Sequence, residues 1–312
     1  MELRSVLFSV LIPAYKRKFL CDAISSCLVQ TYKNFEIIIV DDASPEDLKS
    51  VVDQFHDSRI KYYRNEKNCG AINVVDNWNI CLSYAIGDYV ICMGDDDKLL
   101  PNCLEEYVKL IKKYPNIGLL HGWTEIIDEK SNPIRLTVHR CEFESAISLM
   151  WHRQHVYEDQ FIGDFCFKHS SLKRQNGFLK LPLAWGSDDI SALIAASENG
   201  VANTQSVVFQ YRINSQTISK SCNVEIKLQS IEKEFKWKQN FLAQPIKSHS
   251  DKLYCQQMIK DLKKYKAKKQ GQNLALDMKA HSFFRIFYWW RLRNCYKLEF
   301  KTLVFAFIQA HK

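Results

Sequence analysis

The chain has 312 residues, of which 46% are hydrophobic, and it carries a formal net charge of +8. This length allows one large domain or one domain with an appendage, and the apolar content is ample for a core. The eleven cysteines are odd in number, irregularly spaced and without a C-x-x-C pair, which argues against a small disulfide-linked secreted protein and favours a reducing compartment.

Strand-like and helical patterns alternate over the first 127 residues. Short runs rich in Ile, Val and Phe predict strands, and apolar residues at helical spacing predict the helices between them. The predicted strands are 6–12, 35–40, 60–63, 89–93 and 117–127, and the predicted helices are 18–30, 45–55, 71–84 and 101–113. This alternation indicates βαβ units and an α/β fold with a mostly parallel sheet and flanking helices.

The remainder of the chain is less regular. Residues 161–167 and 207–212 are strand-like, and 188–197 are helical in pattern. From Val224 onward the pattern is helical and lysine-rich, with breaks expected near Pro245 and Gly271. We therefore expect an α/β domain over residues 1–221 and a basic, aromatic-rich helical region over 222–312.

Three consecutive aspartates, Asp95, Asp96 and Asp97, follow the predicted strand at 89–93. Carboxylates at the end of a buried strand repel one another, and each costs several kcal/mol to bury unless a cation or solvent compensates. Oxygen ligands suit Mg²⁺ or Mn²⁺, so the run predicts a divalent metal site. The alternative is a solvated acidic turn before the helix that begins at Pro101.

Two other segments, Pro13-Ala14-Tyr15 and Asp41-Asp42, also follow predicted strands. Because ligands of parallel sheets collect outside the carboxyl ends of the strands, these segments and the aspartate run predict one site. An Asx turn into the helix at Pro45 is the alternative for Asp41 and Asp42. No G-x-x-x-x-G-K-[ST] or G-x-G-x-x-G occurs, so a P-loop or dinucleotide enzyme lacks support.

The ordered motifs SVLIPAY, IIIVDDAS and MGDDD resemble those of the family 2 glycosyltransferases with the GT-A fold. The stretch ISSCLVQTYKNFEIIIVDD is similar to one of that family nearly letter for letter, and the resemblance covers residues 9–212. It implies a Rossmann-like GT-A sheet and a metal-dependent, inverting enzyme. Such an enzyme moves a sugar from a nucleotide sugar, expected to be UDP-linked, to an acceptor hydroxyl with Mn²⁺ or Mg²⁺ as cofactor.

The resemblance also implies roles for single residues. Tyr15 is expected near the base, and Asp42 is expected to accept a hydrogen bond from the uracil imino group. Asp97 is the favoured metal ligand, with Asp96 as the close alternative and Asp95 facing the ribose or supporting the other two. The implied nucleotide-sugar-binding residues are Pro13, Ala14, Tyr15, Asp41, Asp42, Asn68, Gly70, Asn79, Asp95 and Asp96. The family often has Arg-Asn where this chain has Trp78-Asn79, so core packing is expected for Trp78.

The segment LAWGSDDISALIAASENG resembles the acidic start of the family's acceptor-side helix, with Ser187 in place of the usual glutamate. It implies Asp188 as the catalytic base, with Asp189 as the alternative. Helix capping by these acids is the structural alternative. His152 and His155 have the HxxH spacing of some zinc sites, but no Cys pair or carboxylate motif accompanies them, so a polar helix or loop face is favoured.

The C-terminal region interleaves aromatic and basic residues in HSFFRIFYWWRLRNCYKLEFK. This composition predicts contact with an anionic membrane surface, with a hairpin packed on the catalytic domain or a dimer contact as alternatives, so homo-oligomerisation stays open. No run of about 20 apolar residues and no signal peptide is recognised. We expect a cytoplasmic enzyme, peripheral on the inner face of the cell membrane, that acts on a glycan or lipid-linked acceptor of surface-polysaccharide synthesis.

Two other functions stay open from the residues alone. A nucleotidyltransferase would use the same carboxylates and metal, and the basic run at 16–18 after Tyr15 could grip phosphate. A non-catalytic scaffold that binds nucleotide sugar at the membrane is the other alternative. No nucleic-acid-binding motif is recognised, so nucleic acid is not an expected partner.

Overall fold

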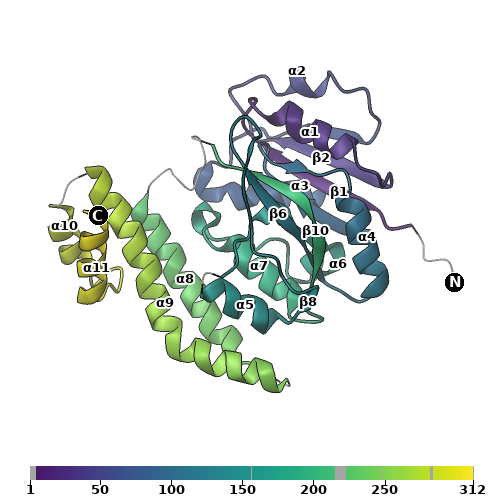
Figure 1. Cartoon of the computed structure of the whole chain (residues 1–312). Helices are drawn as coiled ribbons and strands as arrows, with labels where there is room; N and C mark the ends of the chain where they lie inside the picture. Colours follow the sequence, from purple (N-terminus) through teal and green to yellow (C-terminus); the bar gives the residue numbers. More distant parts are fainter. Residues whose placement is uncertain (1–4, 156, 215–222, 247, 282–283, 312) are drawn as a thin grey trace. The chain divides into compact units, whose positions relative to one another are not determined.

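The computed structural model describes residues 5–311 apart from 156, 215–222, 247 and 282–283 (Figure 1). The chain divides into two compact units, Met1–Lys180 with Ser187–Gln216 and Leu181–Gly186 with Thr217–Lys312. The predicted domain boundary at 221/222 lies outside the described residues.

The first unit is built on a mixed sheet of ten strands among the described residues. Eight of them follow the order β3-β2-β1-β4-β9-β6-β10-β5, while β7 pairs with β6 and β8 with β10. Neighbours in β3-β2-β1-β4 are parallel, as are β6 and β10, whereas β9 runs antiparallel between β4 and β6. The strands are β1 (Phe8–Ala14), β2 (Phe35–Asp41), β3 (Ile60–Arg64), β4 (Tyr89–Cys92), β5 (Lys98–Leu99), β6 (Leu119–Ile127), β7 (Pro133–Leu136), β8 (Phe143–Glu144), β9 (Phe165–Lys168) and β10 (Val201–Arg212).

Helices cover both faces of the strands at the centre of this sheet. Every residue of β2 and β4 is buried, as parallel strands between helical layers require. Side chains of α1 and α4 pack with alternate residues of β1, β2 and β4 in one core, and α3 packs against β1 and β2. The helices of this unit are α1 (Leu20–Leu28), α2 (Lys49–Val52), α3 (Val74–Ser83), α4 (Cys103–Lys113), α5 (Ala146–Gln154), α6 (His169–Arg174) and α7 (Ser187–Ala196), with short 3₁₀ turns η1 (Ala71–Asn73) and η2 (Ile162–Asp164).

Two predicted elements of the first unit differ from the structure. The helix predicted over 45–55 is reduced to the single turn of α2, because the preceding residues form a loop in which Asp47 accepts a hydrogen bond from the Ser50 amide (3.1 Å). The strand predicted over 161–167 begins only at Phe165. It is preceded by η2, where Gly163 lies against the ring of Phe209 in β10.

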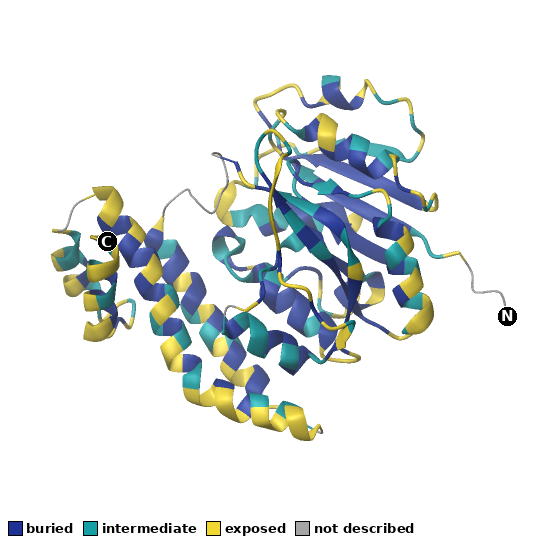
Figure 2. Cartoon of the chain, in the orientation of Figure 1, coloured by how far each residue is buried: buried dark blue, intermediate teal, exposed yellow. Residues whose placement is uncertain are grey.

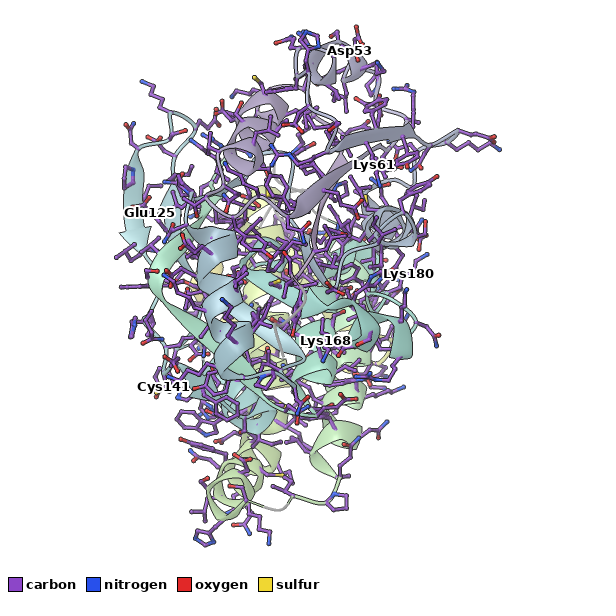
Figure 3. The ribbon with its side chains drawn as sticks, turned by 90° about the vertical axis from the view of Figure 1, so that its right-hand side faces the viewer. Asp53, Lys61, Glu125, Cys141, Lys168 and Lys180 are labelled. Carbon is purple, nitrogen blue, oxygen red and sulfur yellow. The ribbon has the colours of Figure 1, made fainter. Side chains whose placement is uncertain are left out.

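Charged side chains lie along the first unit where strands meet solvent. Figure 3 labels Lys61 on β3 and Glu125 on β6 among them. Lys61 Nζ lies 2.7 Å from the buried carboxylate of Glu36 on the neighbouring strand β2. Glu125 accepts a hydrogen bond of 2.7 Å from Gln210 on β10. These pairs satisfy polar groups between adjacent strands without disturbing the apolar interior.

The second unit is helical. Its elements are η3 (Pro182–Ala184), α8 (Val224–Leu242), α9 (His249–His281), α10 (Arg285–Leu292) and α11 (Phe300–Ala310). The break predicted near Pro245 is confirmed, since α8 ends before it and α9 begins after it. Leu274 and Met278 of α9 share a core with Trp289 of α10. No helix of the described residues is both long and apolar enough to cross a membrane.

The break predicted near Gly271 is wrong, because α9 continues through this residue. A Cβ at Gly271 would lie 2.6 Å from Cδ1 of Phe305 in α11. The glycine therefore allows two helices to approach closely instead of ending one of them. Figure 2 shows that buried and exposed residues alternate along the length of α9.

Candidate active site

The carboxyl ends of β1 and β4 meet at the first of the three aspartates. The Asp95 carboxylate accepts hydrogen bonds from the backbone N–H groups of Tyr15 and Lys16, both at 2.7 Å. Pro13 is half-buried and Ala14 is buried, whereas the Tyr15 side chain is 42% exposed. The structure thus joins two of the three predicted segments directly and leaves the Tyr15 ring accessible for a ligand.

The two aspartates after β2 have different partners. Asp41 is fully buried, accepts from the Ser44 amide (2.7 Å) and the Tyr62 hydroxyl (2.6 Å), and forms an ion pair with Arg64. These contacts hold the loop after β2. The carboxylate oxygens of Asp41 thus have partners within the protein, and the bond from the Ser44 amide is the kind that the Asx-turn alternative predicts.

Asp42 is 7% exposed and accepts hydrogen bonds from the Cys69 amide (2.9 Å) and from Nδ2 of Asn65 (2.8 Å). The same Asn65 amide group donates to Oδ1 of Asn77 (3.0 Å), a buried residue of α3. The loop that follows β3 is therefore tied to the end of β2 through Asp42. Asn65 and Asn77 were not predicted, because nothing in their spacing marks them as partners of an aspartate far away in sequence.

Three other predicted donor-site residues lie after β3 or on α3. Asn68 and Gly70 are exposed, and Gly70 has φ +75° and donates its N–H to the Asn68 side chain. Asn79 donates to the carbonyl of Phe178 (3.1 Å) and accepts from the amide of the same residue (2.8 Å). Both ends of the Asn79 amide thus have backbone partners. Trp78 packs edge-on to Phe178, as expected for a core residue.

The aspartate run is held by a residue that sequence reasoning missed. The backbone N–H of Arg212 donates to Asp97 (3.0 Å), and its Nε donates to the carbonyl of Asp96 (2.8 Å). Asn214 donates to the Asp96 carboxylate. The guanidinium of Arg212 is fully buried, lies 4.3 Å from the ring centre of Phe19, and also donates to the carbonyl of Asp128 (3.2 Å).

Burial makes this acidic corner electrostatically unfavourable. Burial, followed by repulsion from Asp96, raises the pKa of Asp95 to about 6 and raises that of Asp97 well above its ordinary value. A set of buried, mutually repelling carboxylate oxygens fits a hard divalent cation. Since a Mg²⁺-type ion is usually held by one or two carboxylates together with substrate phosphates, the residues present suit such an ion.

The two candidate bases at the start of α7 have different surroundings. Asp189 is buried, and its carboxylate accepts from Nε of Arg153 (3.0 Å) and from Gln160. Asp188 is half-buried. Burial, and then the charges of Asp97, Asp96 and Asp188, raise the pKa of the Tyr211 hydroxyl, so Asp188 and the aspartate run act electrostatically on the same tyrosine. Tyr211 in turn stacks on Phe161, with ring centres 3.7 Å apart.

His152 belongs to a group that its sequence spacing did not reveal. Its Nδ1 lies 3.7 Å from Glu144 and 3.9 Å from Glu158, and among the described residues this is the one trio whose ligand atoms lie within 4.8 Å of one another. Nδ1 is also 2.9 Å from the carbonyl of Ser148, an acceptor only, so this nitrogen carries a proton. Nε of Arg140 lies 3.5 Å from Glu158. The Arg140 guanidinium and the His152 imidazole therefore already lie beside these carboxylates, and we interpret the trio as a largely buried polar network.

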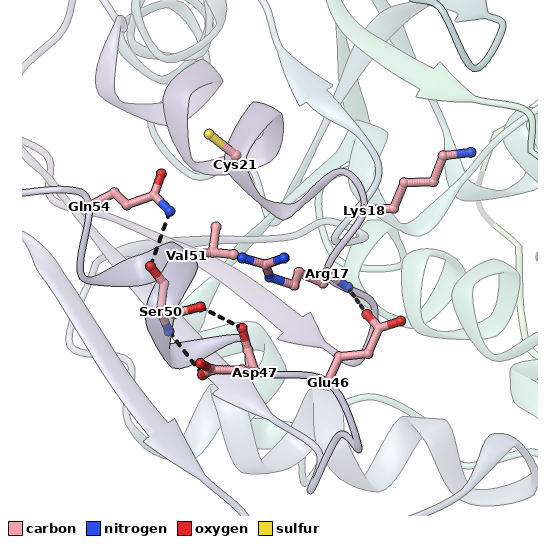
Figure 4. Close-up of a pocket in the computed structure, with 8 residues that line it drawn as sticks. All are labelled: Arg17, Lys18, Cys21, Glu46, Asp47, Ser50, Val51 and Gln54. Atoms are coloured by element: carbon pink, nitrogen blue, oxygen red, sulfur yellow. Dashed lines mark hydrogen bonds between the residues drawn. The ribbon is translucent and has the colours of Figure 1, made fainter.

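An open hollow of about 800 Å³ lies between the loops that follow β1 and β2 (Figure 4). It is lined by residues of both loops and of α1 and α2, namely Arg17, Lys18, Cys21, Glu46, Asp47, Ser50, Val51 and Gln54. None of the predicted site aspartates lines it. Two of its lining residues, Arg17 and Lys18, follow Tyr15 closely in sequence.

A sequence model described as Glycosyl transferase family 2 matches residues 9–178. The chain belongs to glycosyltransferase family 2. The family that the motifs indicated is thereby confirmed, and it is a family of glycosyltransferase enzymes.

Curated relatives are similar in sequence to part of this chain. The Escherichia coli protein UDP-Glc:alpha-D-GlcNAc-diphosphoundecaprenol beta-1,3-glucosyltransferase WfgD is 36% identical over 126 residues, which are 40% of this chain and 48% of WfgD. An uncharacterized glycosyltransferase of Rickettsia conorii is 34% identical over 137 residues, which are 41% of this chain and 21% of that protein. The matched segments thus span less than half the length of these two relatives.

Solved structures extend the likeness to nearly the whole chain. Staphylococcus aureus TarS in complex with UDP-GlcNAc superposes with a TM-score of 0.66 at 12% identity, covering 97% of this chain and 90% of that one. The mannosyltransferase PcManGT of Pyrobaculum calidifontis, in complex with GDP-Man and Mn²⁺, superposes with a TM-score of 0.58 at 16% identity, covering 99% and 87%. At these identities the likeness is one of fold, and it confirms the predicted GT-A architecture with a helical C-terminal part.

Proposed function

We propose that this glycosyltransferase transfers a sugar from a UDP-linked donor to an acceptor hydroxyl, with inversion at the anomeric carbon and with the help of Mn²⁺ or Mg²⁺. The observation that carries the proposal is the pair of hydrogen bonds from Tyr15 and Lys16 to Asp95, which brings the loop after β1 to the aspartate run. TarS, a structural neighbour, holds UDP-GlcNAc in its solved complex.

On the donor side, Tyr15 and Asp42 would receive the base. The Tyr15 ring is accessible, and an aromatic face can stack on uracil. Asp42 uses its carboxylate for the Cys69 amide and Asn65, and a carboxylate has about four acceptor positions, which leaves room for one more donor. The uracil imino N–H is the donor that we assign to it. Pro13, Ala14, Asp41, Asn68, Gly70 and Asn79 would shape the rest of the pocket.

Asp97 and Asp96 would hold the metal, with Asp95 supporting their loop. A divalent ion bound there would neutralise the charge that develops on the diphosphate leaving group. PcManGT carries Mn²⁺ with its donor, which supports the choice of ion. Arg212 keeps the loop in place through the Asp97 carboxylate and the Asp96 carbonyl.

Asp188 would act as the base. Asp188 is half-buried and its charge acts on Tyr211 together with those of the aspartate run, while Asp189 is buried against Arg153 and Gln160. Asp188 would accept the proton of the acceptor hydroxyl as its oxygen attacks the anomeric carbon from the side opposite the nucleotide. A single displacement of this kind inverts the configuration.

The acceptor is proposed to be lipid-linked. The name of WfgD gives a diphosphoundecaprenol-linked sugar as the acceptor of that protein. By analogy we propose a lipid-linked glycan here, with catalysis by residues 1–221 at the cytoplasmic face of the membrane and residues 222–312 as the membrane-directed part.

Calorimetry with UDP-GlcNAc and UDP-glucose, each with and without Mn²⁺, tests the proposal. We expect donor uptake that Mn²⁺ strengthens, and an Asp97→Asn variant that loses this gain. Absence of metal-enhanced uptake of any nucleotide sugar would refute it. Release of pyrophosphate in place of UDP would point to a nucleotidyltransferase, and donor binding without transfer to any acceptor would point to a scaffold.

A further inference from the structure

Helices α10 and α11 of the second unit carry large apolar side chains that nothing in the described chain covers. Figures 1 and 2 show these helices near the C-terminus, with exposed residues in yellow. Five of these side chains are between 37% and 64% exposed. We name them the outer face: Phe287, Trp290, Phe300, Val304 and Ile308.

The outer face is continuous. Phe300, Val304 and Ile308 are spaced four residues apart and form one stripe along α11. Phe287 and Trp290 are three apart on α10, and the rings of Trp290 and Phe300 touch edge-on with centres 5.6 Å apart. The stripe therefore passes from one helix to the next without interruption.

The core of the second unit does not need these residues. On α11 the buried residues are Thr302, Leu303 and Ala306, which lie on the opposite side of the helix from the stripe. Scattered exposed apolar residues are ordinary, but a joined row of aromatic and branched side chains is not. A second apolar surface on a helix pair whose first surface is already buried indicates an external partner.

The charge around the outer face selects the kind of partner. Arg291, Arg293 and Lys301 lie in or between the two helices, against one acid, Glu299. Two further cations there, Arg285 and Lys297, are already paired with Asp277 and Glu232. The Arg293 guanidinium lies 4.1 Å from the ring centre of Trp290. Aromatic rings with cations beside them suit the headgroup layer of an anionic bilayer. A second copy of the same face would bring like charges together, which disfavours a symmetric dimer through it.

We propose that the outer face of α10 and α11 docks on an anionic lipid bilayer, with its aromatic and aliphatic side chains in the headgroup–acyl boundary and its cations on lipid phosphates. This inference deepens the proposed action on a lipid-linked acceptor and rests on it for the biological role. The lipid contact itself is independent of catalysis, so the two can fail separately.

The test is flotation of the full chain with vesicles of phosphatidylcholine, alone or mixed with phosphatidylglycerol. We expect binding to the mixed vesicles that weakens with salt. Replacing Phe300, Val304 and Ile308 together by Ser should lower the bound fraction about tenfold or more. The matched control, Leu253→Ser with Ile259→Ser, changes two apolar residues of α9 that are each 55% exposed and should bind like the wild type.

Four outcomes overturn the inference. The first is that the triple variant floats with the mixed vesicles as well as the wild type does, and the second is that the wild type binds neutral and mixed vesicles equally. The third is that the control variant loses as much binding as the triple variant. The fourth is that the wild type forms an oligomer that the triple variant no longer forms. If circular dichroism shows that the triple variant is not folded, the double variant Arg291→Gln with Lys301→Gln takes its place. Binding of this double variant to anionic vesicles at the wild-type level refutes the proposal. Calorimetric donor uptake, measured on the same proteins, separates this result from a failure of the proposed function.

Discussion

The backbone N–H of Arg212 donates to the Asp97 carboxylate at 3.0 Å, while the guanidinium of the same residue donates to the Asp96 carbonyl at 2.8 Å. One buried residue at the end of β10 thus restrains two of the three aspartates proposed to bind metal. The restraint comes from main chain and side chain together, so it depends on both the register of β10 and the identity of residue 212.

Replacing Arg212 by Lys should weaken Mn²⁺-supported donor binding about tenfold. An ammonium group keeps the charge but cannot reproduce the several directed N–H groups that reach the carbonyls of Asp96 and Asp128. Stability should fall by about 2 kcal/mol because buried carbonyls lose partners. Calorimetry and thermal melts measure both. Arg174→Lys, at an exposed ion pair with Glu198, is the control and should behave like the wild type.

Substitution of Asp188 by Asn should reduce kcat by about 10² to 10⁴, the range of a lost general base, and leave the donor Kd unchanged. The reason is that Asp188 is proposed to contact the acceptor and not the nucleotide. Single-turnover assays with a radiolabelled donor measure the rate. Near-normal turnover would remove Asp188 from the role.

Substitution of Asp189 by Asn should act mainly on stability. Its buried carboxylate pairs with the half-buried Arg153, which also donates to the carbonyl of Glu158 (3.1 Å), so the change removes the ionic partner of this cation. We expect a melting temperature lower by several degrees and a smaller loss of kcat than in Asp188→Asn. A rate loss that exceeds that of Asp188→Asn, without a change in melting temperature, would reverse the two assignments.

Asp42→Asn should weaken UDP binding about tenfold and reduce the preference for UDP over other nucleoside diphosphates. An amide is a poorer acceptor than a carboxylate for the uracil imino N–H, and one of its faces presents a competing donor. Competition calorimetry with UDP, CDP and GDP measures the preference. Asp53→Asn, an exposed aspartate labelled in Figure 3, is the matched control. Unchanged base preference in Asp42→Asn would place the uracil elsewhere.

Glu36 predicts a loss of stability in acid. Burial alone would raise its pKa, but hydrogen bonds from Lys61, Ser9 and the Ile86 amide outweigh it and hold the pKa below the ordinary value. Since the folded pKa is the lower one, the stabilisation is present above the ordinary carboxyl pKa of about 4.3 and is lost as pH falls through the folded value. Glu36→Gln should therefore melt a few degrees below the wild type at pH 7, and the gap should shrink toward pH 3. A gap that is constant over this range would contradict the assignment.

The central strands could be predicted because their burial is visible in the composition of short sequence segments. The strands that end at Ala14, at Asp41 and before the three aspartates are short, β-prone and mostly apolar, with Ser9 and Glu36 as the internal exceptions, which suits burial between two helical layers. Parallel strands place their carboxyl ends at one edge, so grouping the three acidic or aromatic segments needed no coordinates. The helix at 45–55 was mispredicted because a proline and an acid that are typical of a helix start also suit the turn that forms there.

The partners of the site residues could not be predicted in the same way. Arg212 reaches the aspartates from β10, more than a hundred positions along the chain, through the antiparallel pairing of that strand with β5, which begins directly after Asp97. Arg153 reaches Asp189 from α5. Such contacts depend on strand register and helix placement, which no local pattern encodes. Gly271 shows the same limit, since a single glycine in a helical pattern can mark either a helix end or a close contact between two helices.

The two amide groups on Asp95 have a practical consequence for engineering donor choice. The loop proposed to hold the nucleobase donates two backbone hydrogen bonds to Asp95, the first residue of the acidic run. A shift of this loop is therefore transmitted to the acidic run. Grafting the 13–16 loop from a relative with another nucleotide preference would therefore retune ion affinity at the same time. Selection of hybrid enzymes for a new donor should accordingly screen both loops as a single cassette.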